Sequence, residues 1–233
     1  MKKIKNFISK ISYAILPFLI FALVLLVTYF GNQILTTGAV EGSWHYGTTW
    51  PYTPVDDIIP LVPEFIYVYY LTFPVGFVTF FYLAYKNKKS LYDMFLTLIV
   101  SFAISGIIYF LFQSYFVKPD FVPDSFTDNL VVWTWNSTNP TNVFPSQHCF
   151  MAIATFIACL ECKDMKLWYR IFGFAVSILI VLSTVFTKQH YAIDFLGSLV
   201  IMLPIYLLTK RSGMGDICKQ KFQKFYEKFN KKR

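Results

Sequence analysis

"LWYRIFGFAVSILIVLSTVFTKQHYAIDFLGSLVIMLPIYLLT", residues 167–209, decides the fold of this chain. It contains two apolar stretches, 167–186 and 191–209, separated by a short polar turn. Each stretch is close to the roughly 20 residues that a helix needs to cross a hydrocarbon core of about 30 Å. The segment therefore predicts two consecutive transmembrane helices joined by a tight turn.

The same apolar pattern extends over most of the chain. Of the 233 residues, 56% are hydrophobic and 15% are charged, whereas soluble domains carry about 25% charged residues. We predict an all-α fold, a polytopic membrane bundle of six transmembrane helices that occupies residues 1–209, followed by a basic tail at 210–233. The predicted spans, with boundaries uncertain by a few residues, are 13–30, 61–85, 91–116, 146–162, 167–186 and 191–209.

The first two spans have features of their own. Four lysines precede the first span, which is also a pattern of signal peptides, but the apolar stretch is long and no small-x-small cleavage site follows it. We therefore favour a retained membrane anchor over a signal peptide. Pro63 and Pro74 fall within the second span and predict a kink there, because neighbouring helices can satisfy the backbone carbonyl that a proline frees.

Basic residues fix the predicted orientation. With the N-terminus inside, 19 of the 21 Lys and Arg residues fall on the inner side, and only Lys118 and Lys188 remain for the outer segments. Cytoplasmic loops are enriched in Lys and Arg. The sequence therefore predicts an integral membrane protein, which we expect in the plasma membrane, with both termini cytoplasmic.

The basic tail accounts for much of the net charge of +8. Phe222, Phe225, Tyr226 and Phe229 recur at helical spacing with lysines among them, a pattern that predicts an amphipathic helix on an anionic inner leaflet. A merely solvated basic tail is the alternative. In either case the charge describes a membrane surface, so we expect membrane lipids as partners and no nucleic acid.

Few ionisable residues remain near the predicted spans, and each is costly inside a membrane. His148 opens the fourth span, while Lys188, His190 and Asp194 lie at the junction of the fifth and sixth. By the predicted topology both places are at the outer face. His190 and Asp194 are four residues apart, so on a helix the carboxylate can accept the imidazole N–H and leave the other nitrogen free as a nucleophile or base.

The start of the fourth span is typical of an anion site. Pro145 suits the first turn of a helix, and Ser146 with the backbone amides of Gln147 and His148 would surround an anion such as phosphate at the positive end of the helix dipole. Structural alternatives exist for both places. His148 could cap the helix, and His190 with Asp194 could be a buried pair that braces two helices.

These residues resemble two signatures of the type 2 phosphatidic acid phosphatase superfamily. Residues 145–148, PSQH, are similar to P-S-G-H except at Gln147, and Ser183, His190 and Asp194 match S-R-x5-H-x3-D except that Thr184 replaces arginine. Two further stretches, "DDIIPLVPEFIYVYYLTFP" (56–74) and "NPTNVFPSQH" (139–148), look like the branch that includes inositol phosphorylceramide synthase. The resemblance covers about residues 56–200.

The resemblance implies an integral-membrane lipid phosphatase or phosphotransferase that acts at the extracytoplasmic face through a phosphohistidine intermediate. His190 would be the nucleophile, Asp194 its orienting partner and His148 the general acid. Ser146 and Gln147 would hold phosphate oxygens, and no metal or other cofactor is expected. The implied substrate is a phospholipid or a polyprenyl phosphate, and the oligomeric state stays open.

The chain departs from the family pattern where phosphate charge is bound. In the first signature, K-x6-R-P, Lys118 is present, but Ser125 occupies the arginine position, or Asp124 in an alternative alignment. With Thr184 the chain therefore lacks both arginines, whose planar forks bind phosphate bidentately. Lys118 and Lys188 are the outer cations that could replace them, as point charges.

Two other functions remain open on these residues. The missing arginines allow a catalytically weakened family member that binds phospholipid headgroups. A metal-binding or transport bundle built on His148, His190 and Asp194 is the third alternative, although these residues offer few acidic ligands and no internal repeat is present.

Overall fold

Residues 11–32, 34, 52–137 and 140–230 are described by the structure, a computed structural model. Over these ranges the chain is helical, and the only β-type pairing is an isolated bridge between Tyr115 and Thr141. In chain order the helices are η1 (Ser12–Ala14), α2 (Ile15–Leu26), η2 (Val27–Gly31), α4 (Val55–Ile58), α5 (Phe65–Tyr70), α6 (Thr72–Lys86), α7 (Lys88–Leu111), α8 (Phe126–Ser137), α9 (Gln147–Glu161), α10 (Leu167–Phe186), α11 (Ala192–Ser212) and α12 (Met214–Asn230). The predicted all-α class is confirmed.

Five helical segments in the described part are long and apolar enough to cross a membrane. They cover Ser12–Gly31, Phe65–Lys86, Lys88–Leu111, Leu167–Phe186 and Ala192–Ser212. The fourth predicted span corresponds to α9, which has 15 residues and, at about 1.5 Å per residue, is shorter than a hydrocarbon core. The bundle is confirmed with five helices of spanning length and a shorter central one.

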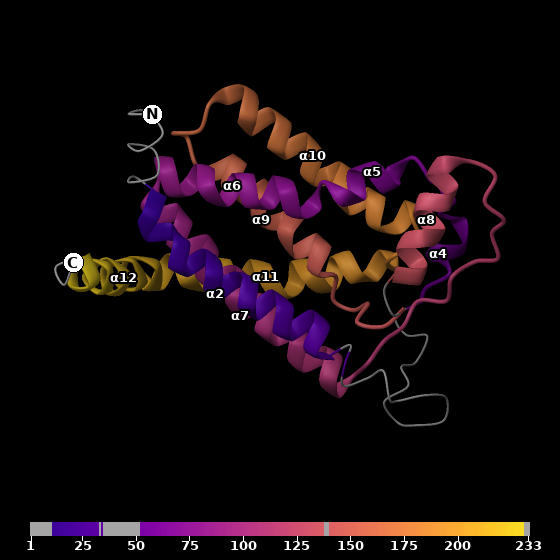
Figure 1. The fold of residues 1–233 in the computed structure, drawn as a ribbon, viewed down its shortest axis with the longest axis horizontal. Helices are drawn as coiled ribbons and strands as arrows, with labels where there is room; N and C mark the ends of the chain where they lie inside the picture. Colours follow the sequence, from indigo (N-terminus) through magenta and orange to yellow (C-terminus); the bar gives the residue numbers. More distant parts are fainter. Residues whose placement is uncertain (1–10, 33, 35–51, 138–139, 231–233) are drawn as a thin grey trace.

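Helix α9 can be short because other helices surround it. It packs against α6, α7, α10 and α11, and Figure 1 shows it in the middle of the bundle. Non-helical backbone is tolerated at membrane depth where protein buries it. The loop before α9 meets this condition, since Asn142, Val143, Pro145 and Ser146 are all buried.

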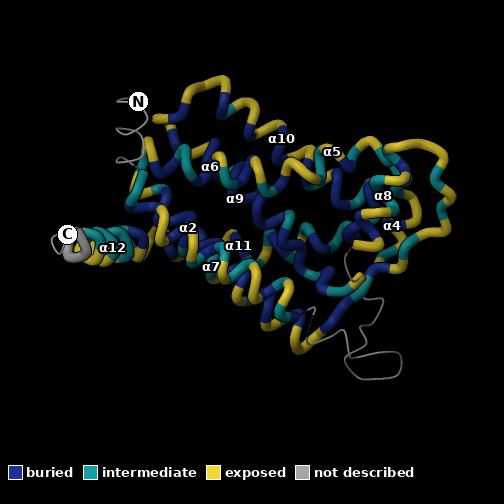
Figure 2. Tube along the Cα trace, viewed as in Figure 1, coloured by how far each residue is buried: buried dark blue, intermediate teal, exposed yellow. Residues whose placement is uncertain are grey.

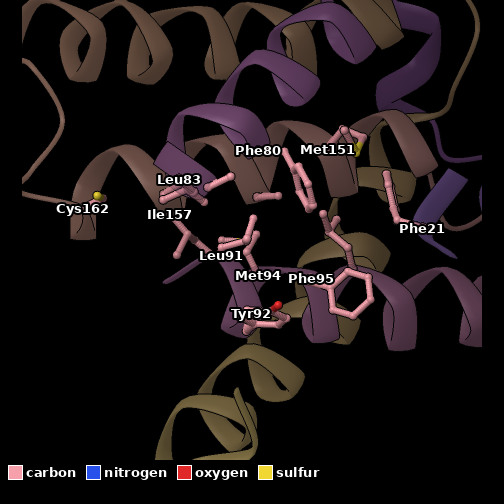
Figure 3. Packing of buried hydrophobic residues seen from close by; sticks show 14 of the residues in the cluster. Phe21, Phe80, Leu83, Leu91, Tyr92, Met94, Phe95, Met151, Ile157 and Cys162 are labelled. Atoms are coloured by element: carbon pink, nitrogen blue, oxygen red, sulfur yellow. The ribbon is translucent and has the colours of Figure 1, made fainter. Parts of the chain in front are cut away.

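Aromatic and aliphatic side chains fill the centre of the bundle. Figure 3 shows Phe80 and Leu83 of α6 pointing toward Met94 of α7 and toward Met151 and Ile157 of α9. Exposed apolar residues lie instead on the outward faces of helices such as α2 and α10 (Figure 2). An apolar outer surface suits a protein that is surrounded by lipid, because lipid tails are as apolar as the protein core.

The first helix belongs to this core. Phe21 of α2 packs edge-on against Phe102 of α7 with ring centroids 5.2 Å apart, and the Tyr13 hydroxyl donates to Ala84 O at 2.5 Å. Near Thr28, at the other end of the first helix, Gly106 lets this helix and α7 lie close together, because a Cβ at Gly106 would meet the Thr28 side chain. The four lysines predicted to precede the span lie outside the described residues.

The second predicted span is interrupted, and only one of its two prolines lies within a helix. Pro63 precedes α5, so its predicted place in the span is wrong. Pro74 lies in the first turn of α6, where it cannot donate to the Tyr70 carbonyl, and α5 and α6 are separated at Leu71. Leu71 keeps helical dihedral angles, with φ −72° and ψ −12°, so the interruption is a kink rather than a break.

Helix α12 confirms that the tail is helical and shows how its aromatic residues divide. Phe222 faces the bundle, with its ring centroid 5.7 Å from that of Tyr92 and 5.8 Å from that of Phe95. The Tyr226 hydroxyl lies 2.7 Å from Ser12 Oγ, while Phe225 is 58% exposed. The predicted aromatic stripe is therefore not a single surface.

The two ends of the bundle differ in character. Both termini and α12 lie at one end, and α4 and α8 lie at the other, beside the turn between α10 and α11 (Figure 1). The Trp135 indole of α8 donates to Thr187 O in that turn at 2.9 Å. The end opposite the termini is where the predicted site residues gather.

Candidate active site

His190 is held by a single ring nitrogen. It lies in the turn between α10 and α11, and its Nδ1 is 3.0 Å from both Asp194 Oδ2 and Val143 O. Both of these oxygens are acceptors, so Nδ1 carries the hydrogen and Nε2 keeps its lone pair. The structure therefore has the His190–Asp194 geometry that the sequence predicted.

Asp194 is fixed at the start of α11. Its Oδ2 also accepts the backbone N–H of Tyr191 at 3.0 Å, and the carboxylate is fully buried. The other oxygen, Oδ1, is buried with no hydrogen-bond donor in the described part of the chain. The position of the carboxylate thus depends on the helix cap and on His190.

The surroundings of His190 keep its ring neutral. Burial, and secondarily the positive charge of Lys118, lower the pKa of His190 to about 3, against an opposing hydrogen bond to Val143 O. Because this value lies far below neutral pH, the imidazole is uncharged there. An uncharged imidazole with a free Nε2 is the form that can act as a nucleophile.

His148 faces His190 from the first turn of α9. Its ring stacks on Tyr69 with centroids 4.3 Å apart and meets the edge of Phe73 at 5.2 Å. The centroids of His148 and His190 are 5.7 Å apart. The helix cap is Ser146, whose Oγ accepts Cys149 N at 3.2 Å, so the capping alternative for His148 is wrong.

The two histidines border a narrow cleft of about 30 Å³. A volume of this size holds about one or two water molecules, so a phosphoryl group requires some opening. The polar side chains that line the cleft beside the histidines are Tyr29, Tyr69, Tyr109, Lys118, Thr141, Asn142, Gln147 and Gln189.

Lys118 is the cation that the structure brings to the cleft. Its Nζ donates to Lys188 O at 2.8 Å and lies 3.4 Å from Gln189 Oε1. Burial lowers the pKa of Lys118 to about 7. Lys118 also lines a second cavity of about 380 Å³, next to Asp57 and Tyr52.

Lys188 does not join the histidines, contrary to the prediction. Its Nζ donates to the backbone carbonyls of Asp56 at 3.1 Å and Ile59 at 2.5 Å, and Lys188 lines the second cavity. The reason is the backbone of the turn. Lys188 has a φ of 51°, and its side chain is therefore directed away from that of His190. Lys118 is therefore the better candidate for a phosphate ligand.

Ser146 and Gln147 also differ from their predicted use. The Ser146 hydroxyl is buried at the helix cap and does not line the cleft. The side-chain nitrogen of Gln147 donates to Thr28 Oγ1 at 3.1 Å and to Ser105 Oγ at 3.2 Å. What remains for an anion is the backbone, because the first N–H groups of a helix have no intrahelical partner.

The positions of the missing arginines are filled by neutral or acidic groups. Thr184 is buried, donates to Val181 O at 2.7 Å and faces the Cys149 sulfur. Ser125 and Asp124 lie before α8, where both backbone N–H groups donate to Asp128 Oδ2. The site therefore has no guanidinium at either position.

Several residues of the site were missed in the sequence. Tyr69 stacks on His148, and the Tyr109 hydroxyl donates to Pro145 O at 2.5 Å. Gln113 and Asn142 join through two hydrogen bonds of 2.8 and 2.9 Å. A buried amide among apolar residues is a weak signal, and nothing in a single sequence pairs positions so far apart.

Three His, Cys, Asp or Glu side chains grouped as metal ligands do not occur among the residues that the structure describes. His148, His190 and Asp194 are close, but Asp194 binds His190 through a hydrogen bond at Nδ1. The metal-binding alternative thus gains no support from this geometry.

The fold and the site define a polytopic helical membrane protein with two facing histidines at one end of the bundle. The family model of the PAP2 superfamily matches residues 39–208, well over half of the chain, and the protein belongs to this superfamily. Its members are phosphoric ester hydrolases or phosphotransferases, and they act on phosphorylated lipids. Comparisons with curated proteins and with solved structures gave no match.

Proposed function

We propose that the protein is an integral-membrane lipid phosphatase or phosphotransferase that works at the extracytoplasmic face through a phosphohistidine intermediate. One observation carries this proposal: His190 Nδ1 is engaged by Asp194 and Val143, which leaves Nε2 free toward a cleft that His148 shares. A buried pair that only braced two helices would not need a second histidine facing it.

The chemistry follows from these two rings. His190 Nε2 attacks phosphorus and the P–O bond to the lipid oxygen breaks. His148, which takes up a proton when the anionic phosphate binds beside it, gives that proton to the lipid oxygen. Water or a hydroxyl group then attacks the phosphohistidine, His148 takes its proton, and the P–N bond breaks to restore the lone pair on Nε2. A general acid of this kind is typically worth about 10²- to 10⁴-fold in rate.

The phosphoryl oxygens need positive partners, and the cleft offers two kinds. Lys118 supplies a charge, and the backbone N–H groups at the start of α9 supply the positive end of a helix dipole. Preorganised groups of this type usually give the largest part of the rate enhancement. Their arrangement supports phosphoryl transfer without the two family arginines.

The face and the substrate rest on charge and resemblance. The turn between α10 and α11, whose His190 lines the cleft, lies at the end of the bundle opposite the termini and α12 (Figure 1), and the predicted inner side carries nearly all basic residues. This supports an extracytoplasmic site, in the plasma membrane. Phospholipids and polyprenyl phosphates are the proposed substrates, and the resemblance to the inositol phosphorylceramide synthase branch supports transfer to a hydroxyl group as well as hydrolysis.

A second candidate is a catalytically weakened family member that binds phospholipid headgroups. The neutral, buried Thr184 favours it, because a guanidinium at that position would add bidentate charge to the site. Phospholipid binding without turnover of any lipid phosphate would identify this function.

The test is product analysis with purified protein in detergent. Lipid phosphates are supplied with and without hydroxyl acceptors, and free phosphate and new phosphodiesters are measured. We expect turnover, a phosphoprotein that is labile to acid and stable to alkali, and loss of both in His190→Ala, by about 10⁴-fold or more in kcat. Thermal unfolding is measured to show that both proteins are folded. If wild type and His190→Ala then had equal turnover, His190 would be excluded as the nucleophile.

A further inference from the structure

Gln147 occupies the position at which this chain departs from the glycine of the family signature. Its side chain is 4% exposed, and its Nε2 donates to Thr28 Oγ1 at 3.1 Å and Ser105 Oγ at 3.2 Å. Ser105 belongs to α7, but Thr28 belongs to the first helix, which precedes the family match at 39–208. A residue outside the matched region thus holds a residue of the signature.

The hydroxyl groups fix which end of the Gln147 amide faces the site. Thr28 Oγ1 donates its hydrogen to Val24 O at 2.8 Å, and Ser105 Oγ donates to Phe102 O at 2.8 Å. Each hydroxyl has one hydrogen, so toward Gln147 both can only accept. The NH₂ group must therefore face them, and the amide oxygen Oε1 points the other way.

Gln147 lines the histidine cleft together with His148, His190 and Lys118. In the described part of the chain, no group donates a hydrogen bond to Gln147 Oε1. Oε1 is therefore the atom of this side chain that is available to accept a hydrogen bond from a molecule in the cleft. Such an oxygen suits the O–H of water, of an alcohol or of a protonated phosphate, and it does not attract a phosphate dianion.

The first helix is tied to the site by more than this contact. Asn32 Nδ2 donates to Thr28 O at 2.8 Å and to Gly106 O at 3.3 Å. Asn142, in the loop before α9, donates to Tyr29 O at 3.2 Å. The segment Val27–Gly31 is π-helical, a form that occurs mostly as single turns and often at functional sites.

We infer that Thr28 is a positioning residue for the site. Together with Ser105, Thr28 orients Gln147 so that the amide oxygen faces the histidines. There the oxygen accepts a hydrogen bond from the hydroxyl group that receives the phosphoryl group, or from the alcohol that is released. The N-terminal helix is then part of the reaction unit, and not only an anchor. This inference rests on the proposed phosphoryl transfer.

The experiment combines substitutions at Thr28 and Gln147 and measures kcat and KM on a lipid phosphate. Thr28→Val keeps the shape and removes the acceptor, and we expect it to lower kcat about 5- to 10-fold, the size of one lost hydrogen bond. Thr28→Ser keeps the hydroxyl and stays near wild type. In a Gln147→Gly background, Thr28→Val changes kcat by less than about twofold, because the partner is already absent.

Thr97 provides the matched control, since it is a buried threonine that donates to a carbonyl four residues before it, Asp93 O at 2.7 Å, away from the cleft. Thr97→Val should leave kcat unchanged. The inference is overturned if Thr28→Val costs the same in both backgrounds, if it has no effect in wild type, or if Thr97→Val costs as much. Should Thr28→Val fail to fold, Ser105→Ala takes its place in the same cycle.

A binding readout separates this inference from the proposed function. If wild type turns over no lipid phosphate, the proposed function fails. The coupling between Thr28 and Gln147 is then measured by the binding of orthovanadate, a phosphate analogue. Binding is followed by the increase in the midpoint of thermal unfolding that orthovanadate produces. We expect Thr28→Val to weaken orthovanadate binding several-fold in wild type and not in Gln147→Gly. Equal weakening in both backgrounds overturns the inference.

Discussion

At the scale of single residues, the tautomer of His190 is the feature that decides reactivity. Asp194 Oδ2 can only accept a hydrogen bond when ionised, so it requires a hydrogen on His190 Nδ1. In Asp194→Asn the amide NH₂ can donate to Nδ1 and place the hydrogen on Nε2, which removes the nucleophilic lone pair. We expect a fall in kcat of about 10³- to 10⁴-fold, as for the equivalent change in serine protease triads, measured by phosphate release and phosphohistidine trapping.

The control for this substitution is Asp120→Asn, because Asp120 is exposed in the loop between α7 and α8. It should leave kcat within about twofold, since an exposed surface change seldom affects a buried site. A folded Asp194→Asn protein with wild-type kcat would show that the tautomer is set without this carboxylate.

Lys118 gives the site a pH dependence whose sign follows from its lowered pKa. Its pKa of about 7 lies below the ordinary lysine value, so Lys118 is cationic below pH 7 and loses its charge above it. In the free enzyme kcat/KM should therefore fall as pH rises through about 7. Lys118→Arg stays protonated and should lack this basic limb on the same substrate.

The comparison with Lys118→Arg removes the contribution of substrate ionisation, because both proteins act on the same lipid phosphate. A bound phosphate favours the charged lysine, so the limb should lie at higher pH in kcat than in kcat/KM. Identical kcat/KM profiles for wild type and Lys118→Arg would show that Lys118 does not hold the phosphoryl group.

The residues that the sequence could place are those whose partners are local. His190 and Asp194 are four apart, and the predicted hydrogen bond is present, although His190 lies in the turn before α11 and only Asp194 lies on the helix. Lys188, two residues before His190, was the nearer of the two predicted outer cations in sequence, yet Lys118 lines the cleft. The left-handed backbone at Lys188 could not be foreseen from the sequence. The contact of Thr28 with Gln147 joins residues 119 positions apart, a distance at which a single sequence carries no pairing signal.

At the scale of elements, α8 was missed. Its 12 residues are too few to span and carry no long apolar run, so they were included in an outer loop. The third span was predicted to run to 116, yet α7 ends at Leu111. Apolar composition continues beyond Leu111, but the chain is already extended there, and Phe116 N donates to Pro140 O at 2.9 Å. The apolar composition of this segment shows that it avoids water, but the end of α7 is decided by the hydrogen-bond partners of the backbone.

Helix α8 supports the turn that carries His190, and one bond transmits this support. The Trp135 indole, 8% exposed, donates to Thr187 O at 2.9 Å. Trp135→Phe keeps an aromatic ring and leaves that carbonyl without its donor. We expect a lower midpoint of thermal unfolding and a kcat reduced about 3- to 10-fold, because a buried unpaired carbonyl costs about 1–3 kcal/mol.

Trp133 offers a matched control on the same helix, since it is 61% exposed. Trp133→Phe should change neither the unfolding midpoint nor kcat. If both substitutions lowered kcat equally, α8 would act through its aromatic surface and not through the bond to the turn.

At the scale of the whole molecule, charge separates the two ends of the bundle. The basic residues that were predicted to be cytoplasmic and that the structure describes include Arg170 and Lys210, and Lys210 pairs with Glu161 at 2.5 Å near the α11–α12 junction. The turn between α10 and α11, whose His190 lines the histidine cleft, lies at the opposite end (Figure 1). The sequence could predict this polarity because insertion follows the positions of Lys and Arg and needs no knowledge of packing.

Helix α12 carries the last prediction, because one of its faces is free of the bundle. Met214, Ile217 and Phe225 are 45%, 52% and 58% exposed, and Lys221 and Lys224 are exposed among them. Apolar side chains flanked by lysines suit an anionic leaflet, where each lysine contributes about 1 kcal/mol. We expect the α12 amides to exchange hydrogen about tenfold more slowly in nanodiscs of anionic lipid than in zwitterionic ones, as measured by mass spectrometry.

Reversing charge on this face tests whether the lysines cause the difference. Lys221→Glu with Lys224→Glu should remove it, since the attraction to anionic lipid becomes repulsion. Lys163→Glu with Lys166→Glu makes the same change in net charge in the loop before α10 and should leave the α12 difference in place. Equal exchange in both lipids would instead favour a solvated helix held by Phe222 and Tyr226 against the bundle. The lipid dependence thus separates a helix that rests on the membrane from one that only packs on its own protein.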